Sequence, residues 1–279
     1  MLEKYFNNNF LDGDCLVGDD FNEKEIGQWY KEEEEAYCNL TSNKNTNKYL
    51  YENINNFYGL PKILHKLKNN KSLNILCFGA AYGGEVRAIK NILDKDTSIV
   101  YNITVIDSSD VMLQSIKEEL DVNIVKASMS GAMQLDMDSF DLITSFGVLH
   151  HIPNVSYILS EFTRVLKPKG FIFLREPISS MGNWSQKRVG TTMNERGISS
   201  EYFLKTFDTL EYKILSKHYC FFSPILKIFN KVKLGLNSYL VIYTDYLFSK
   251  LFSWNIHYFR DTTFKKIAPG SIFMLIQKK

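Results

Sequence analysis

The chain has 279 residues, of which 45% are hydrophobic and 23% charged, and this composition is typical of a globular protein with one large or two small domains. Its formal net charge is +2. Nucleic-acid binding is typical of strongly basic chains, so this net charge does not indicate it. The four cysteines are Cys15, Cys38, Cys77 and Cys220. They form no CxxC pair and no metal-type spacing, and no cluster of carboxylates demands a metal, so we expect free thiols in a reducing cytoplasm and no metal site.

The sequence shows no targeting or membrane-spanning segment. The first residues, MLEKYFNNNFLDGD, are polar and acidic and do not form a charged-then-apolar signal sequence. The longest apolar-leaning stretch covers 234–252. It contains Asn237, Asp245 and Lys250, so it is too polar for a membrane span. We therefore expect a cytoplasmic protein without a transmembrane segment.

Helical patterns come first in the chain, over 23–67. Asn22 is expected to cap the first helix, and Pro61 marks a break further on. The acidic run 32–35 is most simply a solvated helix face. We expect a helical N-terminal extension over 1–70 that caps the substrate site.

From residue 73 short apolar strands alternate with helical segments. Strands are expected at 73–78, 101–106, 122–126, 140–146, 171–176, 211–219 and 271–278, and helices at 84–94, 109–119 and 155–166. Alternation of this kind predicts βαβ units and a parallel sheet with helices on both faces. Ligands of such sheets bind outside the carboxyl ends of the strands, so we expect the chemistry in the loops after the first, second and fourth strands.

The loop after the first strand, GAAYGG (79–84), fits two cofactor-binding patterns, each with one alanine in place of glycine. Read as G-x-G-x-x-G, it is a dinucleotide fingerprint. Read as G-x-G-x-G, it is similar to the loop that S-adenosylmethionine-dependent methyltransferases wrap around their cofactor. Both patterns require an acid after the second strand for the ribose hydroxyls, and Asp107 stands there, 24 residues beyond Gly83. The loop alone does not choose between the cofactors, and a tight turn without a ligand is a third interpretation.

Two downstream segments favour the second pattern. FDLITSFGVLHHIPN (140–154) and LSEFTRVLKPKGFIFLREP (159–177) closely resemble the fourth strand, the following turn, the next helix and the fifth strand of the class I S-adenosylmethionine-dependent methyltransferase family. The resemblance covers about 73–177. It implies a Rossmann-like, doubly wound α/β fold with a seven-stranded, mostly parallel sheet whose last strand is antiparallel. A helical N-terminal extension and a helical insertion before the last strand would be additions to this fold.

The segment RVLKPKG is expected to end a helix and lead into the fifth strand. Lys167 and Lys169 suit the C-terminus of a helix, because cations are favourable there. Pro168 would stop the helix, and Gly170 would provide the turn into the strand.

The resemblance implies a methyltransferase domain over 71–279 that binds S-adenosylmethionine. The cofactor-binding residues that it implies are Gly79, Ala80, Ala81, Gly83, Asp107, Ser108, Met129, Ser130 and Phe146. The chain departs from the family in three ways. Cys77 stands where the family often has Asp, Ala81 replaces the second loop glycine, and no acid follows the third strand in VKASMSGAM. Ala127, Ser128 or the backbone near Met129 would then have to hold the adenine amino group.

Histidines after the fourth strand are the candidate bases. Methyl transfer to an alcohol requires a positioned nucleophile and a group that removes its proton, and histidine titrates in the right range. His150 and His151 lie over the expected methyl-donor site. In plant-type small-molecule O-methyltransferases a histidine at the position that resembles His150 acts as the base. The alternative is that the pair serves packing or loop shape.

Glu176 closes the fifth strand and is expected to face the cleft, as a base or as an acceptor for substrate hydroxyls. The alternative is a salt bridge with Arg175, although strand alternation sends the two side chains to opposite faces.

A long segment without regular structure, 177–198, follows this strand, and we expect it to be a substrate lid rather than a surface insertion. Trp184, Met193 and Ile198 argue against a linker. The residues in it that could contact substrate are Arg188, Asn194, Glu195 and Arg196.

The last two strands are separated by 221–270, which is expected to form two helices rich in aromatic residues. A cap over the active site, a homodimer surface and peripheral membrane contact are all consistent with this composition. His257, Tyr258 and Arg260 are further candidates for substrate contact.

A small polar acceptor is the expected substrate. There is no basic stripe for nucleic acid, and Ser145-Phe146-Gly147 stands where amino-methylating enzymes have an NPPY-like motif. REPISSMGNW and NERGI resemble segments of methyltransferases from bacterial surface-polysaccharide (capsular) pathways, which O-methylate sugars, often as nucleotide-linked donors. The alternatives are another small metabolite with an N- or phosphate-type acceptor, an NAD-dependent oxidoreductase, and an inactive methyltransferase fold that serves as a binding protein.

Overall fold

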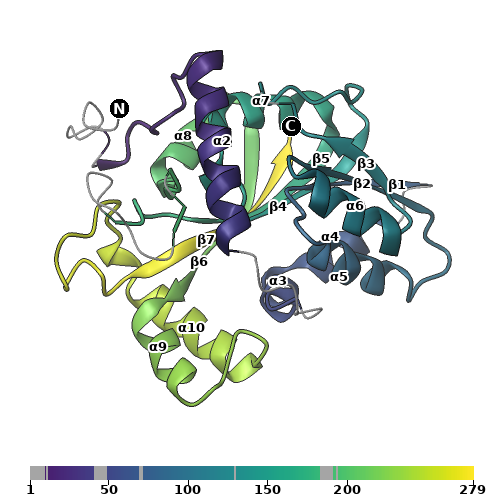
Figure 1. The fold of residues 1–279 in the computed structure, drawn as a ribbon. Coiled ribbons are helices and arrows are strands. Elements are labelled where there is room, and N and C mark those ends of the chain that lie inside the picture. Colours follow the sequence, from purple (N-terminus) through teal and green to yellow (C-terminus); the bar gives the residue numbers. More distant parts are fainter. Residues whose placement is uncertain are drawn as a thin grey trace.

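Seven strands form one mixed sheet in the computed structural model of the chain, which describes residues 10, 12–40, 49–68, 72–128, 130–182, 191–192 and 194–279 (Figure 1). The strands are β1 (Leu73–Phe78), β2 (Tyr101–Asp107), β3 (Asn123–Lys126), β4 (Phe140–Phe146), β5 (Leu166–Pro177), β6 (Tyr212–Phe222) and β7 (Pro269–Lys278). Their order is β3-β2-β1-β4-β5-β7-β6, and β7 is antiparallel to both of its neighbours whereas β1 to β5 are parallel. The predicted fold class is confirmed.

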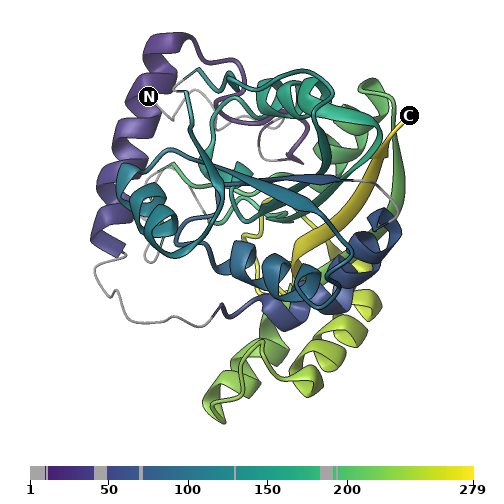
Figure 2. The same cartoon turned by 90° about the vertical axis from the view of Figure 1, so that its right-hand side faces the viewer.

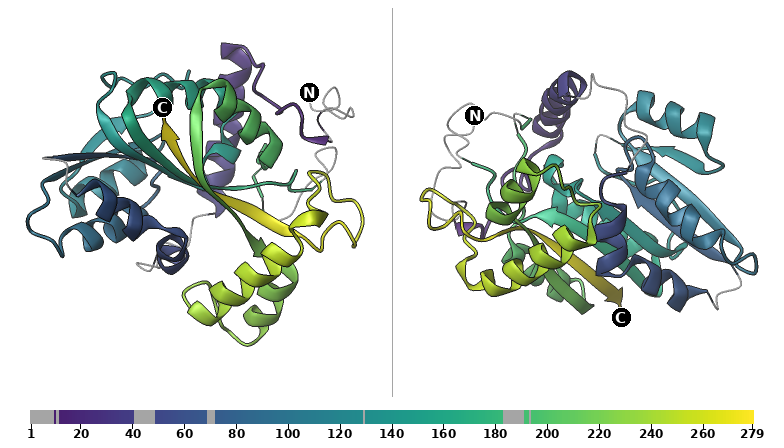
Figure 3. Two further views of the ribbon diagram at one scale, coloured as in Figure 1. Left: turned by 180° about the vertical axis from the view of Figure 1, so that it is seen from behind. Right: turned by 90° about the horizontal axis from the view of Figure 1, so that it is seen from below.

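Helices cover the sheet on both faces. The α-helices of the described residues are α2 (Glu23–Leu40), α3 (Glu52–Tyr58), α4 (Leu60–Leu67), α5 (Gly84–Leu93), α6 (Asp110–Glu119), α7 (Val155–Val165), α8 (Ser200–Thr209), α9 (Ser223–Lys231) and α10 (Tyr239–Leu251). The buried side chains of α7 and α8 pack on one face of the sheet, and those of α3, α4, α5, α6 and α10 pack on the other (Figures 1 and 3). β1 and β4 lie in the middle of the sheet, which is why almost all of their residues are buried.

Asn22 and Gly59 mark the boundaries of the N-terminal helices. The side chain of Asn22 accepts hydrogen bonds from the backbone N–H groups of Lys24 and Glu25, as expected for a cap of α2. The break lies at Gly59, with φ of 132°, and Pro61 lies in the first turn of α4, where its missing N–H costs nothing. Figure 2 shows α2 at the edge of the molecule, apart from the layers on the sheet.

The segment RVLKPKG differs from the prediction. The helix α7 already ends at Val165, so Lys167 and Lys169 belong to β5 instead of a helix C-terminus. The positive φ of 64° is at Lys169, whereas a Cβ atom at Gly170 would lie 2.8 Å from the carbonyl oxygen of Lys167. The strand makes an irregular bend there, and the pairing between β4 and β5 shifts its register. Glycine is needed at 170 for close backbone approach.

The insertion before the last strand consists of α9 and α10, as expected, but it begins after Phe222 because β6 is longer than predicted. The pair of helices projects from the rest of the molecule, beside α3 (Figures 1 and 3). The buried carboxylate of Asp245 anchors α10 by accepting hydrogen bonds from the N–H groups of Phe221 and Phe222, at 2.8 and 2.6 Å. Within the described part of the chain, no helix has both the length and the apolar character that crossing a membrane requires.

Candidate active site

The loop after β1 takes a conformation that glycine favours. Gly79, Ala81 and Gly83 all have positive φ, at 71°, 46° and 75°. For an alanine this region costs about 1–2 kcal/mol, and the N–H of Ala81 is held there by a 3.0 Å hydrogen bond to the carboxylate of Asp107. A Cβ atom at Gly79 would lie 2.3 Å from Val148, so only glycine leaves room for the turn after β4. The loop therefore joins the ends of three strands at the carboxyl edge of the sheet.

Asp107 ends β2 and faces this loop, as predicted. Its second oxygen accepts a 3.0 Å hydrogen bond from the N–H of Ser109. Burial raises the pKa of this carboxyl, while the N–H donors of Ser109, Ala81 and Ser108 oppose the rise. The loop 79–84 and the carboxylate of Asp107 together fit S-adenosylmethionine. The left-handed bends of the loop bring its backbone close to the ligand, and the carboxylate can accept hydrogen bonds from the ribose hydroxyls.

The remaining predicted cofactor residues lie in three settings. Ala80 is buried in the loop. Ser130 follows β3, where its backbone oxygen accepts a 2.9 Å hydrogen bond from the side chain of Asn154. Phe146 packs into the core, with its ring 5.3 Å from that of Phe173. The side chain of Phe146 is therefore part of the hydrophobic core at the end of β4. Met129 lies outside the described residues.

A buried carboxyl that the sequence analysis missed lies beneath the loop. Glu85, in the first turn of α5, accepts a 2.9 Å hydrogen bond from the hydroxyl of Thr144 and also hydrogen-bonds with the thiol of Cys77. Complete burial raises its pKa to about 7, although Thr144, Cys77 and the charge of Arg175 oppose the rise. The family often has an acid where Cys77 stands, and here an acid reaches the same place from the next helix. Its signal in the sequence was the G-G-E at the start of the helix.

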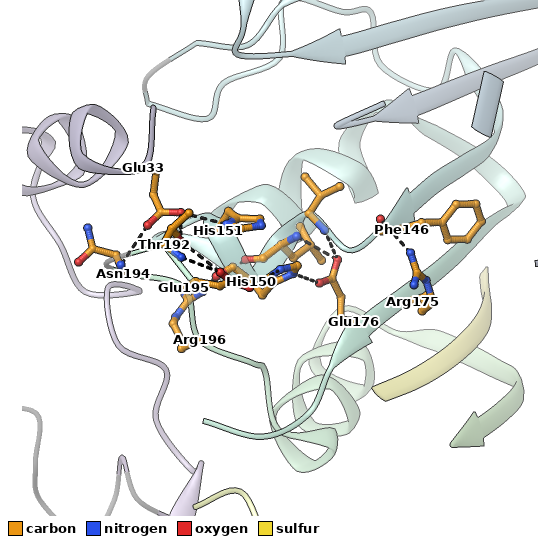
Figure 4. A network of polar contacts seen from close by, with 12 residues as sticks. Glu33, Phe146, His150, His151, Arg175, Glu176, Thr192, Asn194, Glu195 and Arg196 are labelled. Carbon is orange, nitrogen blue, oxygen red and sulfur yellow. Dashed lines mark hydrogen bonds and ion pairs between the residues drawn. The ribbon is translucent and has the colours of Figure 1, made fainter. Parts of the chain in front are cut away.

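Glu176 holds the turn after β4 and its first histidine. The carboxylate is fully buried and accepts hydrogen bonds from the N–H groups of Val148 and Leu149, both at 2.9 Å. Its other oxygen lies 2.8 Å from Nδ1 of His150 (Figure 4). Arg175 lies on the opposite face of β5, so the alternative salt bridge between the two neighbours is absent from the described structure.

His150 lies between two carboxylates. Nε2 of its ring is 3.4 Å from Glu195. Burial alone would lower the pKa of His150, but its contacts with Glu176 and Glu195 outweigh burial and raise it to about 9. Burial would likewise raise the pKa of Glu195, but the hydrogen bond and charge of His150 lower it to about 2. Near neutral pH His150 is therefore an imidazolium, and Glu195 beside it is an ionised carboxylate.

His151 is held by the N-terminal helix. Its Nδ1 lies 2.9 Å from Glu33 of α2, and its backbone oxygen accepts a 2.7 Å hydrogen bond from the indole of Trp29. Glu33 also accepts hydrogen bonds from the hydroxyl of Thr192 and the N–H of Asn194. The expectation that the acidic run is simply a solvated face is therefore wrong for Glu33, which is 7% exposed. α2 thus covers the histidine turn and the segment around Asn194.

Arg196 supports the site instead of facing substrate. Its side chain is 1% exposed and stacks on Trp29, with 5.2 Å between the guanidinium and the ring. The guanidinium donates hydrogen bonds to five backbone oxygens, those of Val17, Leu149, His150, Ile152 and Pro153. Because its donors are used in this way, we interpret it as a positioning residue. Arg188, Trp184 and Met193 of the expected lid lie outside the described residues.

Three side chains come close enough together to hold a cation. One nitrogen from each of His150 and His151 and one oxygen of Glu195 lie within 4.8 Å of one another. However, Nδ1 of each ring already contacts a carboxylate, and the proton on His150 already supplies a positive charge there. We assign no metal to this group.

His257 lies in a different place from these residues. It lines a cavity of about 350 Å³ together with Asp12, Ser199, Tyr258 and Lys265. Neither histidine of the turn, nor Glu176, is part of this lining.

Part of the chain is similar to a known family of methyltransferase domains. Residues 76–174, about a third of the chain, match the family described as "Methyltransferase domain". No curated protein sequence matches the chain. Similar solved structures are no more than 16% identical to the chain among the three that follow, so they show the fold alone.

Three structures illustrate the shared fold. A protein of Galdieria sulphuraria described as a sarcosine dimethylglycine methyltransferase is 16% identical, with a TM-score of 0.57 and coverage of 81% of this chain and 86% of that chain. An S-adenosylmethionine-dependent methyltransferase of Mesorhizobium loti is 13% identical, with a TM-score of 0.51 and coverage of 78% and 96%. The cyclase SpnF is 13% identical, with a TM-score of 0.54 and coverage of 95% and 97%.

The family match spans the glycine loop, the acid after β2 and the histidine turn, which the sheet brings to one edge. The loop therefore follows the S-adenosylmethionine pattern and not the dinucleotide fingerprint. The chain therefore contains a methyltransferase domain over 76–174, and its cofactor is S-adenosylmethionine.

Proposed function

We propose that this enzyme transfers the methyl group of S-adenosylmethionine to a hydroxyl oxygen of a small polar acceptor, a sugar or a nucleotide-linked sugar. The observation that carries the proposal is His150, which lies at the carboxyl ends of β4 and β5 with Nδ1 2.8 Å from the buried Glu176. A hydroxyl must lose its proton as it is methylated, so such an enzyme needs a base at this place. The resemblance of REPISSMGNW and NERGI to sugar methyltransferases supports the sugar class.

The cofactor supplies an electrophilic methyl group on its sulfonium. The loop 79–84 would hold the cofactor through its backbone, and Asp107 would accept hydrogen bonds from its ribose hydroxyls. Ser108, Met129 and Ser130 are further residues that we propose for cofactor binding.

His150 would act as the general base once it has lost its proton. Nδ1–H then donates to Glu176, which fixes the tautomer, and Nε2 faces Glu195 at 3.4 Å. The acceptor hydroxyl would take the place of Glu195 at Nε2. The hydroxyl would pass its proton to Nε2 as its oxygen takes up the methyl group that the bound cofactor would supply. Glu176 stabilises the imidazolium that results.

The pH dependence of methyl transfer tests this role. Because the pKa of His150 is raised to about 9, most of the enzyme below that pH carries a protonated imidazole that cannot act as a base. We expect kcat/KM for UDP-glucose or a free sugar, which reports the pKa of the free enzyme, to rise about tenfold per pH unit and to level off above about pH 9. His150→Gln should lower kcat by roughly 100-fold or more. Transfer of a radiolabelled methyl group measures both.

His65→Gln on α4 is the matched control and should keep the wild-type profile. A profile that is flat between pH 6 and 9, or full activity of His150→Gln, would contradict the proposed base.

N-methylation is the second candidate. The ionised carboxylate of Glu195, whose pKa is lowered to about 2, is suited to hold an ammonium group beside the histidine turn. A structural neighbour is also described as a sarcosine dimethylglycine methyltransferase. Methylation of sarcosine or dimethylglycine, with no methylation of hydroxyl acceptors in the same assay, would replace the proposal by this one.

A further inference from the structure

Arg175 is a buried cation without an ion-pair partner among the described residues. Its side chain lies on the face of β5 opposite Glu176 and is 7% exposed. Nη2 donates one long hydrogen bond, 3.4 Å, to the backbone oxygen of Phe146 (Figure 4). Nε is buried and has no hydrogen-bond partner within the part of the chain that the structure describes. Buried charged groups normally have partners, because a buried charged donor without an acceptor destabilises the fold.

Aromatic rings surround the guanidinium and compensate only part of this cost. Its central carbon lies 4.1 Å from the ring centroid of Tyr51, 5.4 Å from that of Phe221 and 5.9 Å from that of Phe273. Such contacts attract the cation but accept no hydrogen bond from the N–H groups in the guanidinium plane. That planar fork is the geometry that binds a carboxylate or phosphate through two hydrogen bonds.

The acids nearby are occupied by other partners. Glu85 is bound to Thr144 and Cys77, and Asp245 accepts from two backbone N–H groups. Glu176 holds the histidine turn on the opposite face of the strand. No described acid near Arg175 therefore neutralises the guanidinium, and an anionic ligand could do so.

Arg175 borders the same small space as His150. Gly147, which follows β4, donates its N–H to the backbone oxygen of Arg175 at 2.7 Å. A Cβ atom at Gly147 would lie 3.6 Å from Nη2 of Arg175 and 3.7 Å from Cε1 of His150. A ligand above Gly147 can therefore touch both the guanidinium and the imidazole. This place lies at the carboxyl ends of β4 and β5, where ligands of such sheets bind.

We infer that Arg175 binds an anionic group, a carboxylate or a phosphate, of the acceptor while one of the acceptor's hydroxyls faces His150. The inference rests on the proposed function and narrows it to anionic acceptors, such as sugar acids and sugar phosphates. The carboxylate of S-adenosylmethionine has the same chemistry, so the experiment must separate the two sources.

Calorimetric titration of the enzyme saturated with S-adenosylhomocysteine tests the inference, with acetate, inorganic phosphate and glucuronate as probes at constant ionic strength. The wild type should bind at least one of them, and Arg175→Gln should weaken that binding about tenfold or more. Arg175→Lys should lie between the two, because it keeps the charge but not the fork. Lys205→Gln removes a surface charge on α8 and should bind like the wild type.

A comparison of S-adenosylhomocysteine with 5′-methylthioadenosine, which lacks the amino-acid carboxylate, identifies the source. If Arg175→Gln abolishes the preference for S-adenosylhomocysteine and the saturated wild type binds no probe, the anion belongs to the cofactor and the inference about the acceptor is overturned. Equal binding of a probe by wild type and Arg175→Gln would also overturn it.

The wild-type titration is informative even if Arg175→Gln does not fold, because absence of probe binding by the wild type contradicts the inference. Anion binding is an equilibrium property that does not depend on methylation. Probe binding without any hydroxyl methylation would therefore count against the proposed reaction alone.

Discussion

Glu85 shows how one buried carboxyl couples stability to pH. Its folded pKa is raised to about 7 by burial, whereas the same group in the unfolded chain ionises near its ordinary value of about 4.5. Between these two values the unfolded chain loses the proton that the folded protein keeps. The free energy of unfolding therefore falls as pH rises through this window, and it stops changing above about pH 7 on account of this group.

Glu85→Gln should remove this pH dependence. From pH 5 to pH 8 the wild type should lose on the order of 2–3 kcal/mol more unfolding free energy than Glu85→Gln does, at 1.36 kcal/mol per pKa unit. Urea unfolding of both proteins at the two pH values measures the difference, and other titrating groups cancel in the comparison. Parallel losses in the two proteins would show that Glu85 is ionised in the folded state.

Residues whose role depends on chain neighbours were predictable, and those whose role depends on packing were not. Asp107 and Glu176 could be placed because each ends a strand, and strand ends meet at one edge of a parallel sheet. Glu33 was misread because nothing in α2 shows that Thr192 and His151 pack against it. An unpaired guanidinium such as Arg175 is likewise visible only once the strands are assembled.

At the scale of elements, the turn that carries the histidines is held from two sides. Glu176 of β5 accepts hydrogen bonds from the N–H groups at the start of the turn. Arg196 donates hydrogen bonds to carbonyl oxygens along the turn. The sequence predicted the turn and its strand, but not this clamp, because Arg196 reads as a substrate-binding residue until its hydrogen bonds are seen. The helix end before β5 was misplaced for a related reason, since the pairing with β4 extends the strand back to Leu166.

Arg196→Met should loosen this clamp. Five buried carbonyl oxygens would lose their donor, and we expect the free energy of unfolding to fall by roughly 3–5 kcal/mol. Urea unfolding measures the loss. Lys205→Met breaks an exposed ion pair with Asp14 and should leave the free energy of unfolding nearly unchanged. A loss within 1 kcal/mol for Arg196→Met as well would show that water replaces the guanidinium and that the clamp does not stabilise the turn.

At the scale of the whole molecule, the alternation of strands and helices was enough to predict the sheet, because each βαβ unit has one favoured way to pack. The additions were harder to interpret. Side chains of α2 reach the histidine turn, and Tyr51, just before α3, lies over Arg175, so we propose that 1–70 acts as a cap on the acceptor site. The helices α9 and α10 present exposed apolar side chains, among them Leu240, Leu247 and Leu251, and their role as a cap or dimer surface stays a prediction.

The central claim is that the loop after β1 and Asp107 form the S-adenosylmethionine site, and calorimetric titration with S-adenosylhomocysteine tests it most directly. We expect binding in the micromolar range for the wild type, no binding of NAD, and affinity about tenfold or more weaker for Asp107→Ala, which loses the acceptor for the ribose hydroxyls. Ser98→Ala, at an exposed turn, should bind like the wild type. Unchanged affinity in Asp107→Ala, or binding of NAD alone, would contradict the account.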